Sequence, residues 1–154
     1  MRIESTKKRT AILLAVLGLA GILVIAAGPG AQADKQFTDR SIQGTYGFSV
    51  SGTSGDVGAV VVGLFTFDGK GGCTIKEDVN AAPPIGFVAS RTSTSCTYKV
   101  NPDGTGTQIA VFGPPIPETL DISFVIVGNG DEIKFISTNP GLIFSGTARK
   151  QVSK

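Results

Sequence analysis

Hydrophobic and polar residues alternate along the chain from about residue 42 onward, and Gly, Asn, Asp and Pro interrupt this alternation at short intervals. The alternating segments are rich in Val, Ile, Thr and Phe, and none has helical periodicity. Alternation with a period of two is typical of strands with one buried face. The pattern predicts eight strands, over residues 43–51, 57–67, 73–80, 88–100, 105–112, 119–127, 132–138 and 142–149.

The segments between these strands have the composition of tight turns. They include residues 68–71 (DGKG), 101–104 (NPDG), 128–131 (GNGD) and 139–141 (NPG). Gly supplies positive φ, Pro presets φ, and Asn and Asp bond to the nearby backbone. Because a parallel crossover needs a dozen or more residues, connections this short predict an antiparallel meander.

A meander of eight strands has two exposed edges unless it closes on itself. Closure gives a barrel whose interior is filled by side chains or holds one small ligand. We therefore expect an all-β fold, an eight-stranded antiparallel up-and-down barrel. The alternative is an open β-sandwich, because the same pattern suits two packed sheets.

The first 33 residues have a different pattern. Four basic residues and one acidic residue precede an uncharged apolar stretch over residues 11–27, and Gly28-Pro29-Gly30 and the small residues Ala31 and Ala33 follow. This pattern indicates a helical secretory signal peptide over residues 1–33, leaving residues 34–154 as a single β-barrel domain that is secreted or periplasmic. The alternative is an uncleaved N-terminal anchor, because about 17 apolar residues reach the lower limit for spanning a bilayer.

Charge and composition exclude several functions. The net charge of +2 comes from the first segment, because 10 basic and 11 acidic residues follow residue 33. Without a basic cluster we expect no nucleic-acid partner, and we expect membrane contact only through an uncleaved signal. The chain has no His, which excludes Ser-His-Asp and Cys-His catalysis and His-based metal sites. We expect no metal and no cofactor.

Cys73 and Cys96 are the two cysteines of the chain. In an oxidising compartment such a pair is expected to form a disulfide. If residues 73–80 and 88–100 form a hairpin centred on Pro84-Ile85, the numbers of opposite residues sum to about 169, which pairs the two cysteines. The alternation places the bridge on the apolar face, and closing this loop is expected to stabilise the fold by roughly 3 kcal/mol.

The alternation also assigns an inner and an outer face. The inner face has enough aromatic residues to fill a small barrel: Tyr46, Phe48, Val50, Phe65, Phe67, Leu120, Ile122, Phe124, Ile126, Ile133, Phe135 and Phe144. The outer face has apolar residues at Val60, Val62, Leu64, Val125, Val127, Ile136 and Ile143. Exposed apolar patches indicate interfaces, so we expect a homo-oligomer. The alternatives are cover by residues 34–42 and a sandwich with both faces partly buried.

The candidate ligand-binding residues are Tyr46, Phe67, Glu77, Tyr98 and Phe124. The aromatic rings would surround a small apolar or amphipathic molecule, and a Tyr hydroxyl or Glu77 would hold its polar end. An inward Glu77 would have a raised pKa through desolvation, which suits proton transfer or polar binding. The alternative is a solvated carboxylate near the barrel mouth or an ion pair with Arg91.

The first and last predicted strands resemble those of the calycin superfamily, chiefly the lipocalins. Gly44-Thr45-Tyr46 opens the first strand and Arg149 lies near the end of the last. In lipocalins the first-strand aromatic is Trp, here Tyr46, and the resemblance implies that Arg149 covers it through a cation–π contact. The middle lipocalin motif, Thr-Asp-Tyr, has no counterpart. Residues 62–69 (VGLFTFDG) are similar to strands of the allene oxide cyclase barrel, whose catalytic residues have no counterpart here.

Three functions agree with these predictions. The first is an exported, non-catalytic barrel that binds a small apolar or amphipathic ligand. The second is a structural or interaction protein of the cell envelope that assembles through its apolar outer face. The third, less favoured without His, is a cyclase or isomerase that uses Glu77 as a base. A cavity on the order of a few hundred Å³ favours the first or third function, and a filled interior favours the second.

Overall fold

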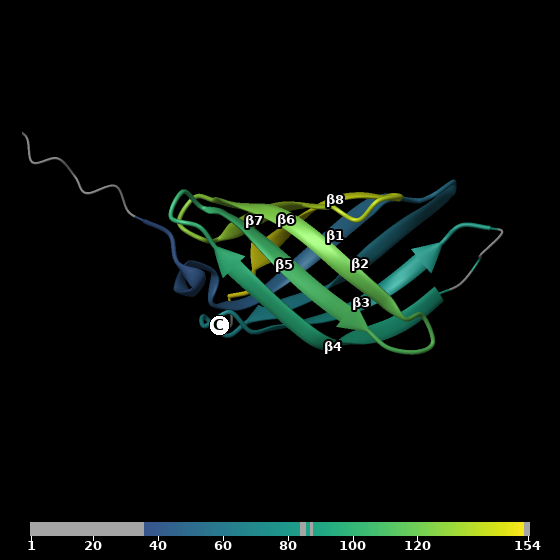
Figure 1. Cartoon of the computed structure of the whole chain (residues 1–154), viewed down its shortest axis with the longest axis horizontal. Helices are drawn as coiled ribbons and strands as arrows, with labels where there is room; N and C mark the ends of the chain where they lie inside the picture. The colour runs from purple at the N-terminus through teal and green to yellow at the C-terminus, as the bar shows by residue number, and fades with distance from the viewer. Residues whose placement is uncertain (1–35, 84–85, 87, 153–154) are drawn as a thin grey trace, which may run out of the picture. The chain divides into compact units, whose positions relative to one another are not determined.

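The computed structural model describes residues 36–83, 86 and 88–152, which form a closed barrel of antiparallel strands in chain order (Figure 1). Pairing of the first strand with the last closes the barrel, so the up-and-down barrel is confirmed and the open sandwich is wrong. The predicted signal peptide and the boundary after residue 33 lie outside the described residues. The elements are a 3-10 helix, η1 (Asp39–Ile42), and the strands β1 (Gly44–Ser54), β2 (Val57–Phe67), β3 (Cys73–Ala81), β4 (Val88–Val100), β5 (Thr105–Phe112), β6 (Glu118–Val127), β7 (Glu132–Ser137) and β8 (Leu142–Lys150).

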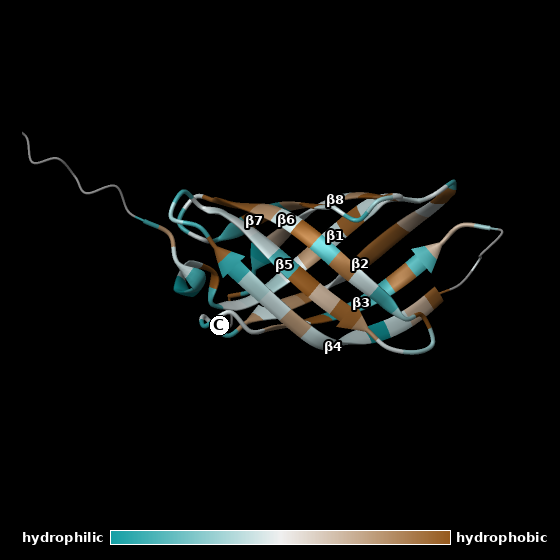
Figure 2. Cartoon of the chain, viewed as in Figure 1, coloured by the Kyte–Doolittle hydropathy of each residue, from teal (hydrophilic) through white to brown (hydrophobic). Residues whose placement is uncertain are grey.

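Inward side chains form one core, and the alternation of polarity along the strands can be followed in Figure 2. The predicted inner face is confirmed, although Val50, Leu120 and Phe144 are only partly buried. Aromatic rings fill the middle of the barrel. Phe48 stacks on Phe65 with ring centroids 4.2 Å apart, and Phe135 meets Phe65 edge-on at 5.2 Å.

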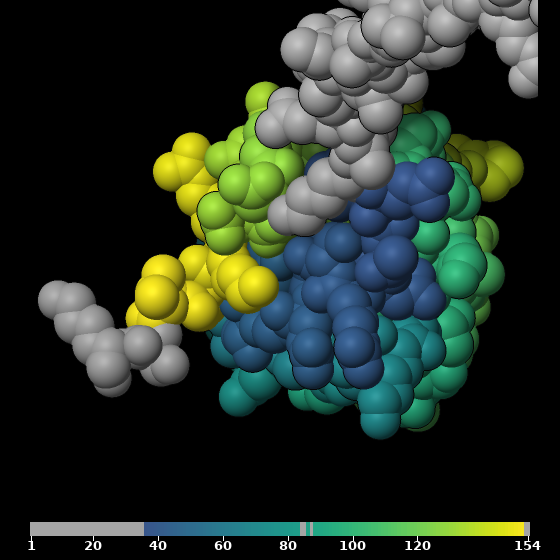
Figure 3. Space-filling view, turned by 90° about the vertical axis from the view of Figure 1, so that its left-hand side faces the viewer, coloured from purple at the N-terminus to yellow at the C-terminus, as the bar shows by residue number. Residues whose placement is uncertain are grey.

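The η1 helix closes one end of the barrel. Its Ile42 is fully buried, and Asp39 holds it in place: Oδ1 accepts a hydrogen bond from the Val100 N–H at 2.8 Å, and its carbonyl oxygen accepts one from the Tyr98 hydroxyl at 2.9 Å. Figure 3 shows this end, where residues at the start of the described chain lie across its centre in purple and blue. The rings of Tyr46, Phe67 and Tyr98 below this helix are buried, and this half of the barrel is called the solid half below.

Two inward aromatic rings fit only because glycine lies opposite them. A Cβ atom at Gly106 would lie 2.2 Å from Cζ of Phe124, and one at Gly63 would lie 2.8 Å from Cζ of Phe48. Contacts that short do not occur, so a larger residue would displace the ring. Glycine on β2 and β5 thus allows the rings to cross the interior.

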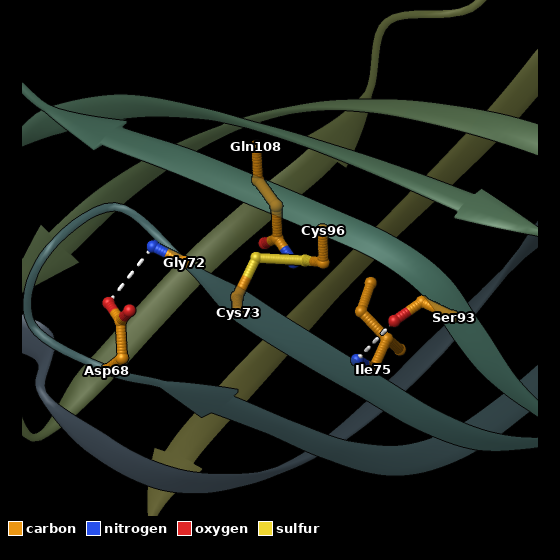
Figure 4. The surroundings of a disulfide bond; sticks show 7 residues. All are labelled: Asp68, Gly72, Cys73, Ile75, Ser93, Cys96 and Gln108. Atoms are coloured by element: carbon orange, nitrogen blue, oxygen red, sulfur yellow. Dashed lines mark hydrogen bonds between the residues drawn. A yellow bond between two sulfur atoms is a disulfide. The ribbon is translucent and has the colours of Figure 1, made fainter.

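The Cys73–Cys96 disulfide joins β3 to β4, as predicted (Figure 4). Across the hairpin, however, opposite residue numbers sum to one less than predicted, since Glu77 lies opposite Arg91. One extra residue in β4, between Ser93 and Ser95, interrupts the pairing of β4 with β5 as a β-bulge does, and beyond it Thr97 lies opposite Gly72. The bulge restores the predicted register at the cysteines, and it lets both Arg91 and Cys96 point inward.

Candidate functional site

The half of the barrel away from η1 holds a cavity of about 190 Å³. Its floor consists of the rings of Phe48, Phe65 and Phe135. The cavity exists because the inward residues above this floor have small or branched side chains, among them Val50, Val57, Ala59, Val61, Val79 and Ala81. A dry apolar cavity of about 150 Å³ is enough for benzene. This cavity therefore has room for a single ring or a short chain.

Three charged side chains, Glu77, Arg91 and Glu118, form one wall of the cavity and are called the charged trio below. Strand pairing sets Arg91 of β4 opposite Glu77 of β3, and Glu118 is the first residue of β6. The Arg91 guanidinium donates from Nε to Oε1 of Glu77 and from Nη2 to Oε2 of Glu118, both at 2.7 Å. Side-chain exposure is 5% for Glu77, 10% for Arg91 and 24% for Glu118. Arg91 thus links two carboxylates inside a largely apolar barrel.

Further contacts fix the plane of the guanidinium. Its central carbon lies 4.1 Å from the ring centroid of Phe112, and Nη1 donates to the Ile116 carbonyl oxygen at 3.5 Å. Arginine over an aromatic ring is a favourable arrangement, more so when water is excluded. The Ile116 contact ties the β5–β6 loop to the trio, so that loop is positioned at the mouth of the cavity.

The trio carries a net charge of −1 when all three groups are ionised. Burial raises the pKa of Glu77, the Arg91 charge and hydrogen bond oppose this rise, and the Glu118 charge adds to it. Burial therefore outweighs the ion pair, and the ionised form of Glu77 is destabilised relative to solution. Each carboxylate uses one oxygen for Arg91, and the other oxygen bonds to no described residue. Since no fully buried side-chain oxygen in the described part of the chain lacks a partner, these second oxygens face the cavity or its mouth.

The structure divides the predicted ligand-binding residues between the two halves of the barrel. Glu77 lines the cavity, as an inward acid that is also paired with Arg91. Tyr46, Phe67 and Tyr98 pack together in the solid half, with centroids 5.6 Å apart for Tyr46 and Phe67 and 4.9 Å for Phe67 and Tyr98. Phe124 packs against Gly106. The four rings thus contribute core packing. The ion pair of Glu77 with Arg91 agrees with the alternative stated for Glu77, whereas Glu118 was not among the predicted binding residues.

The Tyr hydroxyls already have partners within the protein. Tyr46 donates to the Gly130 carbonyl oxygen and Tyr98 to that of Asp39. Burial, with a smaller contribution from the Asp131 charge, raises the pKa of Tyr46 to about 12. Its hydroxyl therefore stays protonated at neutral pH and remains a donor to the backbone. Neither hydroxyl is placed to hold the polar end of a ligand in the cavity.

The contact between Arg149 and Tyr46 that the lipocalin resemblance implied is wrong by one residue. Tyr46 lies opposite Lys150, and Arg149 lies opposite Gly47. Because side chains alternate along a strand, Arg149 points outward, where its Nε donates to Glu132 at 2.9 Å. The Nζ of Lys150 lies 5.8 Å from the Tyr46 ring centroid and occupies the place expected for Arg149.

Apolar side chains on the outer face are exposed, as predicted. Val60 and Val62 of β2 are each 56% exposed, and Ile136 of β7 is 52% exposed. Small polar residues of β1 and β8 lie between these strands and form the floor of a shallow groove: Ser49, Ser51, Ser145 and Thr147. Residues 36–42 lie at the closed end of the barrel and do not cover this face, so the described part of that alternative is wrong.

No family model, curated protein or solved structure matches the chain. Within the described ranges no helix is long and apolar enough to cross a membrane. Fold and site define the class of protein: a small, disulfide-bonded, closed eight-stranded β-barrel with a largely apolar cavity and a charged trio in its wall. At the level of the fold it is consistent with a lipocalin-like barrel.

Proposed function

We propose that the chain is an exported, non-catalytic β-barrel protein that binds one small apolar or amphipathic molecule in the cavity in the half of the barrel away from η1. The observation that carries this proposal is the cavity itself, with its apolar lining and a single wall of converging polar groups. Binding sites for small molecules have this composition, in which apolar surface supplies affinity and a few polar groups fix orientation. The volume limits the buried part of the ligand to a single ring or a short chain.

Export is supported by two independent features of the chain. The basic and apolar pattern of residues 1–33 is that of a secretory signal. The disulfide between Cys73 and Cys96 fits a compartment that favours oxidation of thiols.

A cavity-filling variant tests the binding site. Val61 of β2 is buried and lines the cavity, whereas its neighbour Val60 points outward. We expect benzyl alcohol to bind the wild-type protein saturably at one site, and Val61→Phe to weaken this binding at least about tenfold by filling the cavity. Val60→Phe makes the same substitution on the outer face and should bind like wild type. Isothermal titration calorimetry measures all three, and circular dichroism checks the fold.

Two results would contradict the proposal. One is the absence of saturable binding to the wild-type protein of benzyl alcohol and also of its charged analogues benzylamine and benzoate. The other is equal binding by Val61→Phe and wild type, because the probe would then occupy some other place on the protein.

A second candidate function, assembly of a cell-envelope protein through its outer face, is favoured by the exposed side chains of Val60, Val62 and Ile136. Exposed apolar residues that gather beside a groove are typical of interfaces. This function predicts a sedimentation coefficient that rises with protein concentration, and Val62→Lys should abolish the rise. A coefficient that stays constant across the accessible concentrations would exclude self-association.

Catalysis as a cyclase or isomerase has less support. Glu77 is the candidate base, and the Arg91 guanidinium donates to its carboxylate at 2.7 Å. The ion pair makes Glu77 a poorer proton acceptor than the same buried carboxylate would be without Arg91, because it stabilises the charged form.

A further inference from the structure

We infer that the molecule bound in the cavity is an amphipathic amine, whose apolar part fills the cavity and whose protonated amino group lies against Glu77 and Glu118. This inference rests on the proposed binding function and adds the chemical class of the ligand. It stands on the charge of the cavity wall, on the way Arg91 is engaged, and on the carboxylate oxygens that remain.

The charged groups that line the cavity are the three members of the trio. Two carboxylates and one guanidinium leave one negative charge in excess. The rest of the lining is apolar apart from Ser54 and Ser137, and the Ser137 hydroxyl already donates to the Leu142 carbonyl oxygen and accepts from the Phe144 N–H. A ligand cation would therefore bring the wall to neutrality, and charges in such a water-poor site interact more strongly than in bulk water.

Arg91 is engaged in a way that disfavours an anionic ligand. Its Nε and Nη2 donate to the two carboxylates at 2.7 Å, and one face of the guanidinium lies on the Phe112 ring. A ligand carboxylate that took over one of these donors would leave the buried Glu77 or the half-buried Glu118 without its partner. Such an unpaired buried charge is costly, so the cavity should reject acids.

The second oxygens of the carboxylates match the donors of an ammonium group. Glu77 is 5% exposed, yet only its Oε1 is bonded to Arg91, and only Oε2 of Glu118 is bonded in the same way. A protonated amine has three N–H donors and a positive charge, so its hydrogen bonds to these remaining oxygens would be charge-assisted. A hydroxyl has one donor and no charge, so an alcohol of the same shape should bind more weakly.

Three probes of matched shape test the inference: benzylamine, benzyl alcohol and benzoate. With protein produced from the full chain at about pH 7, we expect benzylamine to bind at least about tenfold more tightly than benzyl alcohol, and benzoate more weakly than the alcohol. Glu77→Gln should bring the ratio of amine to alcohol affinity close to one. Asp78→Asn removes the same charge from the outward neighbour on β3 and should leave the ratio unchanged.

The outcomes separate this inference from the proposed function. If benzyl alcohol or benzoate binds as tightly as benzylamine, the amine inference is wrong and the binding function stands. If none of the three probes binds, the binding function itself fails. Glu118→Gln, at a more exposed position, supplies the same test if Glu77→Gln does not fold, and an unchanged ratio in a folded variant of either residue overturns the role of the trio.

Discussion

Replacing Arg91 by methionine is expected to lower the free energy of unfolding by about 3 kcal/mol at neutral pH. Arg91 donates to Glu77 and Glu118, and both acids face an apolar interior. Methionine keeps most of the packing on Phe112 but leaves two carboxylates near each other without a cation. The loss comes mainly from these unpaired charges, so restoring neutrality should restore stability. Adding Glu77→Gln and Glu118→Gln to Arg91→Met should therefore recover most of it.

The effect of Arg91→Met should depend on pH with a definite sign. Burial raises the pKa of Glu77 above its unfolded value, and Arg91 opposes this rise. The folded protein therefore binds more protons than the unfolded chain between those two pKa values, so the ionised carboxylate costs stability as pH rises through that window. Without Arg91 the cost grows. Urea denaturation followed by circular dichroism should show a larger loss at about pH 7 than at about pH 4.

A basic residue on the same strand provides the control for Arg91→Met. Lys99 of β4 pairs with Asp39 at 3.4 Å but is largely exposed, so Lys99→Met should cost about 1 kcal/mol or less. Equal losses for the two variants, or a loss for Arg91→Met that does not change with pH, would show that the charged trio does not act as described.

Removing the disulfide, by Cys73→Ala together with Cys96→Ala, is expected to lower the free energy of unfolding by about 3 kcal/mol. The bridge links residues 23 apart in sequence. It restricts the unfolded chain much more than the folded barrel, in which strand pairing already holds β3 beside β4. Urea denaturation measures the loss, and the wild-type protein should show the same loss once it is reduced.

The double cysteine variant carries its own control. Because it has no bridge, its stability should not respond to a reducing agent, whereas that of the wild type should fall. A variant as stable as the oxidised wild type would mean that the bridge does not restrain the unfolded chain. A variant much less stable than the reduced wild type would instead indicate that alanine leaves voids beside the buried Gln108.

The strands and the closed meander could be predicted because alternation and turn chemistry point to the same elements. The prediction ended the first strand at residue 51, but β1 continues to Ser54. Gly52, Thr53 and Ser54 carry no apolar signal, yet they pair with β2 up to the turn at Gly55. Backbone pairing therefore extends a strand beyond its apolar pattern.

The position of Arg91 could not be predicted from the pattern around it. Residues 90–95 (SRTSTS) are polar on both faces, so an extra residue there leaves no mark on the alternation. Pairing the two cysteines predicts the correct register of β4 near Cys96. The bulge between Ser93 and Ser95 shifts the register by one residue, so the prediction is wrong at Arg91. A strand that is polar on both faces specifies its register only weakly. Here the ion pair between Glu77 and Arg91 agrees with the observed register.

Depth along the barrel explains why the predicted binding residues separate. Alternation states which side of a strand a residue occupies, but it does not state how far the residue lies from either end. Tyr46 and Phe67 lie at the ends of β1 and β2 that face η1, whereas Glu77 lies in the half away from it. Their positions within the predicted strands carry this information, because adjacent strands in a meander run in opposite directions.

Both ends of the described chain leave the barrel on the side that η1 closes. Near the start, the Phe37 N–H donates to the Pro102 carbonyl oxygen, and near the finish the Gln151 N–H donates to that of Thr45. A tether joined at either point would hold the protein by its sealed base, with the opening turned away from the support. The barrel is thus suited to display on a bead, a sensor chip or a carrier protein, with the cavity half of the barrel facing the solution.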